Sequence, residues 1–416
     1  ISMSLSSSKL IILDRDGVIN EDRDDYVKSV DEWIPLHGSL EAIALLNQAG
    51  YQIAIATNQS GLSRGYFTIN DLHAMHSKMD KLLKPLGEAV KERYPNAQLS
   101  IVTNGSLFDD EKLAWVEALD VGIGLSHDGP AQIYRGPDPL NDPANLAQIK
   151  RWVSRRMSID RMSFNTVLHR NNQSLKAVRM YFSEKLDLPV QAVVLATEEV
   201  MLPYDQSGLS LALHGNDHAR YLHQMFWELV TGSGMAVGTM RDKVDEFLRS
   251  QAQSRPLASL GQKCGMDRDD SIAVDMKGNV TTCQNMSAST HHKIGHVDQF
   301  DAIALDTAYH FSTRSECPRC PVAQLCKGAC LFLEDGYWEA ACDNSFSHNL
   351  AVLAAALYYQ TQGLILTRIE GDAIRRDTVS EIDVIHLGFV ESNGDMSTIS
   401  PLERAIKPFP VRVTHA

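Results

Sequence analysis

Cysteine is missing from most of this chain. None precedes Cys264 in the 416 residues, and all seven fall between Cys264 and Cys342. The long N-terminal part therefore has no thiolate metal site and no internal disulfide. In a reducing compartment, an odd and clustered set of cysteines binds metal more often than it forms disulfides. We therefore expect one shared chemical role for the seven thiols.

Long apolar runs and an excess of positive charge are missing as well. The most apolar run, residues 350–359, is about half of the roughly 20 residues that a membrane helix needs. The net charge of −13 argues against a broad phosphate-binding surface. No positive segment followed by an apolar core opens the sequence. We therefore expect a cytoplasmic protein with neither nucleic acid nor a membrane as partner.

Residues 1–88 predict a βαβα unit, which is half of an open α/β sheet. Short apolar runs at 9–14 and 51–57 are typical of buried parallel strands, and 38–49 and 69–86 have helical periodicity. Chemistry lies at the carboxyl ends of such strands. Asp14 and Asp16 follow the first strand, where one carboxylate can attack phosphorus and the other can move a proton. Thr57 and Asn58 end the second, where they can hold a phosphoryl oxygen.

Two motifs of this unit resemble the haloacid dehalogenase (HAD) superfamily, and within it the heptose-bisphosphate phosphatases. They are Leu-Asp-Arg-Asp-Gly-Val-Ile-Asn (13–20) and Ala-Thr-Asn-Gln-Ser-Gly-Leu-Ser-Arg-Gly-Tyr-Phe (56–67), and the resemblance covers 9–86. It implies that Asp14 is the nucleophile and a Mg²⁺ ligand, Asp16 the general acid/base and Thr57 a phosphate ligand. The family's third-motif lysine, fourth-motif acidic pair and zinc loop have no counterpart here. Two interpretations stay open: a Mg²⁺-dependent sugar (heptose) bisphosphate phosphatase, or a structural half-domain with relic carboxylates.

Residues 89–255 predict part of a (β/α) barrel with linking helices at 216–252. We expect strands at 99–103, 121–126, 162–168 and 190–196, and helices at 111–119 and 145–156. His214 and His218 have helical i, i+4 spacing but no obvious third ligand, and we expect them on an exposed polar face.

Three stretches of this region resemble radical S-adenosylmethionine (SAM) enzymes of the sulfatase-maturating and peptide-modifying group. They are Ile-Val-Thr-Asn-Gly-Ser-Leu (101–107), Gly-Leu-Ser-His-Asp-Gly-Pro (124–130) with Tyr-Arg (134–135), and Phe-Asn-Thr-Val-Leu (164–168). The resemblance implies that Ser126 contacts the SAM carboxylate, with Arg135 as a weaker candidate. It also implies a ribosomal peptide or protein substrate and an electron donor. The CxxxCxxC loop that holds the catalytic cluster is absent, because Asp-Arg-Asp-Gly stands after the first strand. We therefore expect no reductive SAM cleavage by this chain alone.

Residues 256–348 carry the cysteines as C-x13-G-x4-C, then C-x2-C-x5-C-x3-C, then C, with a hairpin expected at 272–283 around Gly278. One zinc ion would use four thiolates and leave three, whereas seven suit two iron–sulfur clusters. The pattern resembles the SPASM domain, which holds auxiliary [4Fe–4S] clusters. That resemblance implies two ligand sets: Cys264, Cys283 and Cys330 for a first cluster with an open iron, and Cys317, Cys320, Cys326 and Cys342 for a second. Structural zinc and disulfides remain the alternatives.

The two resemblances meet between residues 86 and 94. Either the chain is a recombination or assembly product, or the βαβα unit replaces the first two units of the barrel. In the second case Asp14, Thr57, Asn104 and Ser126 share one edge of one sheet. The predicted fold class is α/β: half of a HAD-like Rossmannoid sheet joined to a partial (β/α) barrel, followed by a small cysteine-rich domain. Residues 349–416 predict a helix at 349–360, a strand at 382–390 and a tail without assigned function.

Overall fold

The structure of the chain is a computed structural model. It describes residues 9–13, 21, 27–29, 31–36, 39, 51–55, 91–92, 99–105, 109–156, 161–198, 206–254, 273–274, 279–283, 292–304, 311, 314–330, 332–333, 335–371, 381–386 and 408–413. The helices expected at 38–49 and 69–86 lie outside these residues, apart from Ser39.

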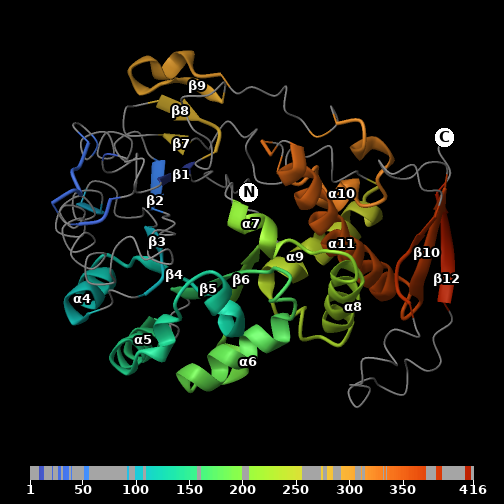
Figure 1. Ribbon diagram of the computed structural model, residues 1–416, viewed down its shortest axis with the longest axis horizontal. Coiled ribbons are helices and arrows are strands. Elements are labelled where there is room, and N and C mark those ends of the chain that lie inside the picture. Colours follow the sequence, from blue (N-terminus) through green and yellow to red (C-terminus); the bar gives the residue numbers. More distant parts are fainter. Residues whose placement is uncertain are drawn as a thin grey trace, which may run out of the picture.

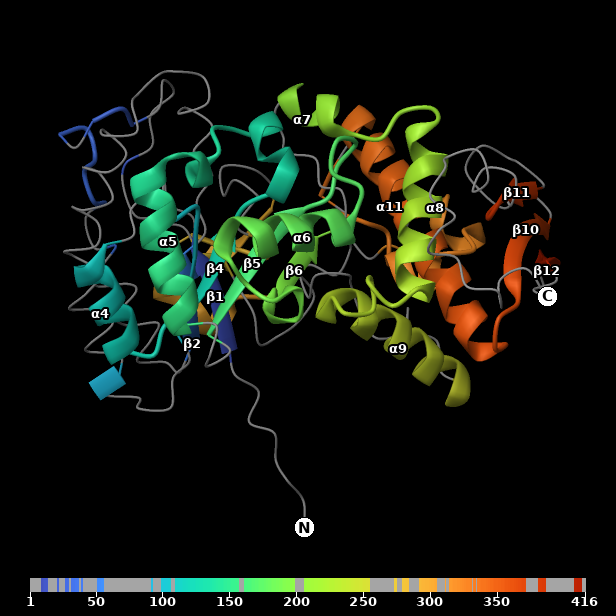
Figure 2. The same ribbon diagram turned by 90° about the horizontal axis from the view of Figure 1, so that it is seen from below.

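A six-stranded parallel sheet occupies the N-terminal half (Figure 1). Its strands follow one another in chain order: β1 (Lys9–Leu13), β2 (Tyr51–Ile55), β3 (Ser100–Thr103), β4 (Gly122–Ser126), β5 (Met162–Val167) and β6 (Leu195–Glu198). Right-handed crossovers between strands in such an order place the connecting helices on one face. Both views agree that α4 (Asp110–Ala118), α5 (Pro143–Arg156) and α6 (Leu175–Leu186) cover the same face (Figures 1 and 2). This is the arrangement of an open (β/α) barrel.

The part that resembles HAD phosphatases and the part that resembles radical SAM enzymes are joined by a regular parallel strand pair. β2 and β3 are parallel, with Ala54 opposite Ser100 and Ile55 opposite Ile101. A sheet broken between these strands would have contradicted the hypothesis that the βαβα unit replaces the first two barrel units. The observed pairing confirms that placement of the strands.

The last strand of the sheet begins later than predicted. Residues 190–192 form a 3₁₀ turn rather than the start of a strand, and β6 begins at Leu195. Pro189 has φ of −59° and its carbonyl accepts the amide of Ala192 at 2.8 Å, which closes the turn. The preceding helix α6 was not predicted at all. Its first turn is capped by Ser174, whose hydroxyl accepts the amide of Ala177.

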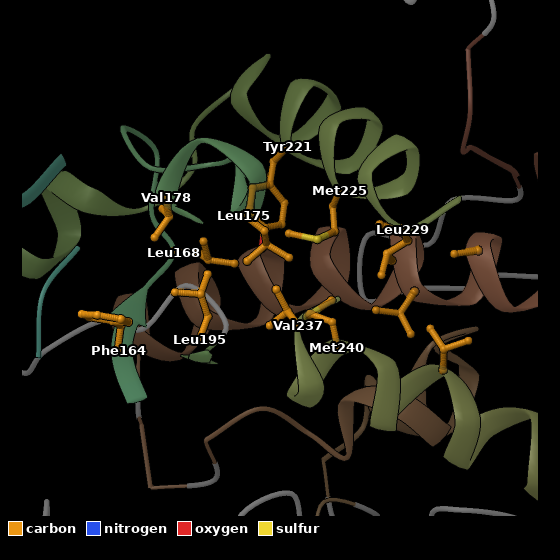
Figure 3. Close-up of a cluster of buried hydrophobic side chains, with 14 of the residues drawn as sticks. Phe164, Leu168, Leu175, Val178, Leu195, Tyr221, Met225, Leu229, Val237 and Met240 are labelled. Atoms are coloured by element: carbon orange, nitrogen blue, oxygen red, sulfur yellow. The ribbon is translucent and has the colours of Figure 1, made fainter. Parts of the chain in front are cut away.

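One apolar core joins the sheet to the helices that follow it. In Figure 3, side chains from β5, β6 and α6 gather with those of α8 (Asp217–Val230) and α9 (Gly238–Ala252). Phe164 and Leu195 come from the sheet, and Met225 and Leu229 from α8 (Figure 3). Because the cluster is continuous, the barrel part and the linking helices fold as one body.

Helix α11 (Asp335–Gln360) is longer than the predicted 349–360 and carries Cys342. It packs along α8 and α9 (Figures 1 and 2). Its N-terminal half contains Asn344, Ser345 and Ser347, which favour caps and turns over helix interiors. Tertiary hydrogen bonds hold this half: the amide of Leu213 donates to Asn344 Oδ1 at 3.0 Å, and Tyr221 and His348 share a hydrogen bond of 2.7 Å.

Two small sheets complete the structure. The predicted hairpin is confirmed as β7 (Ala273–Val274) against β8 (Asn279–Thr281), with β9 (Lys293–His296) on the other side of β8. β7 contacts β1, the first strand of the large sheet (Figure 1). In the tail, β10 (Ile365–Gly371) lies between β11 (Glu381–Asp383) and β12 (Pro408–Val413). The strand predicted at 382–390 therefore ends at Asp383. Within the described residues, no helix combines the length and apolarity of a membrane span.

Candidate functional site

The carboxyl ends of all six strands meet at one edge of the large sheet, because every neighbouring pair is parallel. β3 and β4 end at Thr103 and Ser126, and Asn104 follows β3 directly. Four predicted site residues that follow β1 and β2 in sequence lie outside the described residues: Asp14, Asp16, Thr57 and Asn58. Ser126 is half-buried and stands opposite Asn165 of β5.

Arg135 is paired with a buried carboxylate at this edge. Its Nη1 lies 3.1 Å from both oxygens of Asp128, which also accepts the amide of Val167 at 2.9 Å. His169 Nε2 lies 3.7 Å from the same carboxylate. Burial raises the pKa of Asp128. The His169 contact, the Arg135 charge and the Val167 amide together lower it by more, so the net shift is downward. Asp128 was not among the predicted site residues, although the Asp-Gly-Pro directly after β4 marks the position.

A second buried polar group adjoins the first. Asp138 accepts hydrogen bonds from Tyr181 at 2.7 Å and from the amide of Leu140 at 2.8 Å, and His127 Nε2 lies at 2.9 Å. The amide of Gly129 donates to His127 Nδ1, which leaves Nε2 as the ring donor to Asp138. Burial opposes ionisation of Asp138, but these hydrogen bonds lower its pKa to about 2. Burial and the neighbouring carboxylate raise the pKa of Tyr181.

Four cysteines line one cavity in the C-terminal half. Cys317 begins a 3₁₀ turn, Cys326 ends the short helix α10 (Ala323–Cys326), and Cys342 comes from α11. Trp338 and Phe346 of α11 complete the apolar side of the wall. The four thiols are those of Cys317, Cys320, Cys326 and Cys342, the set that the sequence assigns to the second cluster.

These four thiols belong to the wall of the cavity. Among the residues with described positions, no three cysteine, histidine or acidic side chains form a site for a single metal ion. Cys317 is buried, and burial together with the neighbouring thiols of Cys326 and Cys342 raises its pKa to about 12. Because only the thiolate is a metal ligand, a bound metal must supply the charge that favours deprotonation.

The described cysteines of the first predicted ligand set lie beside the cavity and not in its wall. Cys283 and Cys330 both pack against a small cluster formed by Phe311, Cys317 and Phe332. Cys264, the third member of this set, lies outside the described residues. No disulfide joins any two of the six described cysteines. Cys283 and Cys330 do not line the four-cysteine cavity, but they adjoin it through Cys317, which belongs to both the cavity and this cluster.

The histidine pair does not form a site on one helix. His214 precedes α8, and its ring bonds the carbonyl of Leu209, whereas His218 Nδ1 lies 2.9 Å from Ser347 Oγ on α11. The expected exposed polar face is therefore wrong for His218, whose ring contributes to the contact between α8 and α11.

Comparison with known proteins gives two likenesses of different extent. No family model matches the chain. The fold is similar to native anSMEcpe with bound AdoMet, with a TM-score of 0.52 and 18% identity over 84% of this chain and 100% of anSMEcpe. The structure of anSMEcpe with bound AdoMet and Cp18Cys peptide has the same TM-score and identity over 84% of this chain and 99% of anSMEcpe.

The second likeness is confined to the N-terminal fifth. Over 79 residues the chain is 66% identical to D-glycero-beta-D-manno-heptose-1,7-bisphosphate 7-phosphatase of Neisseria meningitidis serogroup A, covering 19% of this chain and 42% of that protein. The phosphatase of the same name from Pseudomonas aeruginosa is 56% identical over 84 residues, 20% of this chain and 47% of its own length. The chain spans less than half the length of these curated relatives. It is therefore similar to AdoMet-bound anSMEcpe in fold over most of its length, and to heptose-bisphosphate phosphatases in sequence over its first fifth.

Proposed function

We propose that this chain is an iron–sulfur protein of the radical SAM/SPASM peptide-maturase type that holds two auxiliary [4Fe–4S] clusters. The cavity lined by four cysteines carries the proposal. A cluster of several atoms needs space between its thiolate ligands, and four thiolates complete the ligation of one cluster. Cys283 and Cys330, with Cys264, would hold the other cluster and leave one iron open. Bound there, the clusters supply one-electron transfer.

The chain's own residues fit SAM cleavage poorly. Asp14 and Asp16 stand after β1 where the catalytic cluster requires three cysteines, and no cysteine precedes Cys264. Arg135, a weaker candidate for the SAM carboxylate, pairs with Asp128. We therefore place SAM chemistry outside the function of this chain alone, and propose electron transfer or peptide binding by the cluster domain. The peptide-bound anSMEcpe supports a peptide or protein partner, with an electron donor to reduce the clusters.

Anaerobic reconstitution with iron and sulfide tests the proposal. We expect about eight irons and about eight sulfides per chain, four of each for each cluster. The double variant Cys320→Ser/Cys326→Ser should keep about four irons in the site of Cys283 and Cys330. The matched variant Cys283→Ser/Cys330→Ser should keep about four in the cavity. Stoichiometric zinc without sulfide in the wild-type chain would refute the clusters and favour structural zinc.

A second candidate function rests on the N-terminal identity. We propose as the alternative a Mg²⁺-dependent phosphatase of the HAD type that acts on a sugar (heptose) bisphosphate. In it Asp14 would attack phosphorus and bind Mg²⁺, Asp16 would move the proton, and Thr57 and Asn58 would hold the phosphoryl oxygens. The 66% identity over 79 residues supports it. Mg²⁺-dependent phosphate release from D-glycero-beta-D-manno-heptose-1,7-bisphosphate, lost in both Asp14→Asn and Asp16→Asn, is the expected result. Release that persists in Asp14→Asn would contradict this assignment.

A further inference from the structure

A single guanidinium lies beside both groups of cysteines. Arg314 Nη2 donates to the carbonyl of Leu333 at 3.0 Å, and its Cζ lies 4.3 Å from the centre of the Trp338 ring. Trp338 lines the four-cysteine cavity. Leu333 and Trp338 belong to one apolar cluster, against which both Cys330 and Cys342 pack. The two contacts of Arg314 therefore reach the walls of both predicted cluster sites.

The position of Arg314 is fixed by its backbone as well as by its side chain. Its amide donates to the carbonyl of Phe311 at 3.1 Å, and its own carbonyl accepts the amide of Cys317 at 3.3 Å. The side chain stacks on an aromatic face, an arrangement that a planar guanidinium favours and that holds the charge in place. These contacts hold the guanidinium beside the cysteines.

The electrostatic environment of Arg314 involves cysteines of both groups. Burial lowers the pKa of its guanidinium, and electrostatic interactions with Cys317, Glu316, Cys342 and Cys330 offset this only in part, so the net shift is downward. Two of these cysteines belong to the four-cysteine cavity and Cys330 to the other group. Arg319, another cation of this segment, is exposed. Water and salt screen an exposed charge far more strongly than a half-buried one.

A cluster becomes more negative by one charge when it is reduced. A nearby buried cation stabilises the reduced form more than the oxidised form, and so raises the reduction potential. We propose that Arg314 is the shared counter-charge of both clusters, raising the reduction potential of each. This inference depends on the two clusters of the proposed function.

The test compares three variants of the full chain after anaerobic reconstitution. Arg314→Gln removes the charge, Arg314→Lys keeps it, and Arg319→Gln removes an exposed charge nearby as a matched control. Midpoint potentials are measured by equilibrium redox titration followed by electron paramagnetic resonance, with iron content determined on the same samples.

We expect Arg314→Gln to weaken reduction of both clusters about tenfold, which is a fall of 59 mV for a one-electron couple. Arg314→Lys should recover at least half of that fall, and Arg319→Gln should leave both potentials at the wild-type values. If Arg314→Gln loses iron while Arg314→Lys retains it, the charge is needed for loading, which also supports the proposal.

Other outcomes overturn the inference. Unchanged potentials in a fully loaded Arg314→Gln protein would show that the charge has no effect on the clusters. A shift of one cluster alone would show that the charge is not shared. Loss of iron in both Arg314 variants would assign the residue a packing role. A wild-type chain that takes up no iron would instead refute the proposed function, so the two failures are distinguishable.

Discussion

Replacing Glu228 by alanine should loosen the start of α6. This carboxylate of α8 is 3% exposed and reaches across to the N-terminus of α6. It accepts hydrogen bonds from the backbone amides of Leu175 and Lys176 at 2.8 and 3.2 Å. It also accepts hydrogen bonds from the hydroxyl of Ser174 and from the side-chain amide of Gln224, the latter at 2.7 Å. Ordinary capping residues lie within their own helix, so this contact ties two elements together.

The magnitude follows from the donors that are left without an acceptor. Stranding the buried amide of Leu175 costs about 1–3 kcal/mol, and the part-buried amide of Lys176 costs less because water can reach it. Loss of a negative charge from a helix N-terminus adds about 0.3–1 kcal/mol. Relief of a desolvated carboxylate offsets part of this loss, because burial raises the pKa of Glu228. We expect a net loss of about 3 kcal/mol of local stability. A raised folded pKa means that Glu228 stabilises the fold most below its ordinary pKa of 4.5, so the loss shrinks as the pH rises.

Hydrogen exchange of the amides at 174–186 measures this local stability, which a global unfolding curve of a chain of this size would obscure. A loss of about 3 kcal/mol corresponds to exchange about 100-fold faster. Gln224→Ala is the matched control, since it removes one exposed donor to the same carboxylate and should change exchange less than about tenfold. Exchange of α6 in Glu228→Ala within threefold of the wild type would refute the reasoning.

Three further substitutions test other parts of the fold. The folded pKa of Asp138, about 2, lies below its ordinary 3.8, so its stabilisation is complete above pH 3.8 and is lost as the pH falls toward 2; the difference in urea midpoint between wild type and Asp138→Asn should therefore shrink from pH 6 to pH 3, and an equal difference at both would contradict this. Tyr221→Phe removes the buried hydrogen bond to His348 and should cost about 1 kcal/mol in thermal unfolding, whereas an unchanged midpoint would mean that the bond contributes nothing. Gly129 and Gly215 both have positive φ, so an alanine at either site costs about 1–2 kcal/mol of backbone strain. Gly129→Ala should destabilise more than Gly215→Ala, because only at Gly129 would the new Cβ also meet Val178, at 3.2 Å. Equal urea midpoints for the two variants would show that the contact with Val178 adds no cost.

The strands of the sheet could be predicted from sequence because each is a short apolar run followed by a polar residue. β3 ends at Thr103 and β4 at Ser126, at the residues where the pattern places those ends. The start of β6 was predicted too early because residues 190–196 are apolar apart from Gln191, so composition alone does not separate the turn after Pro189 from the strand. The first half of α11 was not predicted from the sequence, because tertiary hydrogen bonds, and not helix propensity, hold residues such as Asn344 in the helix.

Some residues of the candidate site could likewise be predicted from the sequence, and others could not. The resemblance to the SPASM domain implies the grouping of Cys317, Cys320, Cys326 and Cys342, which spacing alone does not specify, and these four line one cavity. Arg314 carries no such signal, since its importance depends on Leu333 and Trp338, which approach it only through the fold. Asp128 likewise carries no such signal, because the Val167 amide and the His169 ring that contact it lie about 40 residues further along the chain.

The pairing of β2 with β3 has a consequence for how such chains can arise. A parallel ladder is built from backbone amides and carbonyls, so it does not recognise which side chains its strands carry. A βαβα segment of suitable strand length and twist can therefore be exchanged at this seam while the remaining ladder stays intact. Such an exchange replaces the loop at the end of the first strand together with β1, the strand that β7 contacts. The backbone pairing of β2 with β3 can therefore accept different βαβα segments, and the segment present determines which side chains follow the first strand of the sheet.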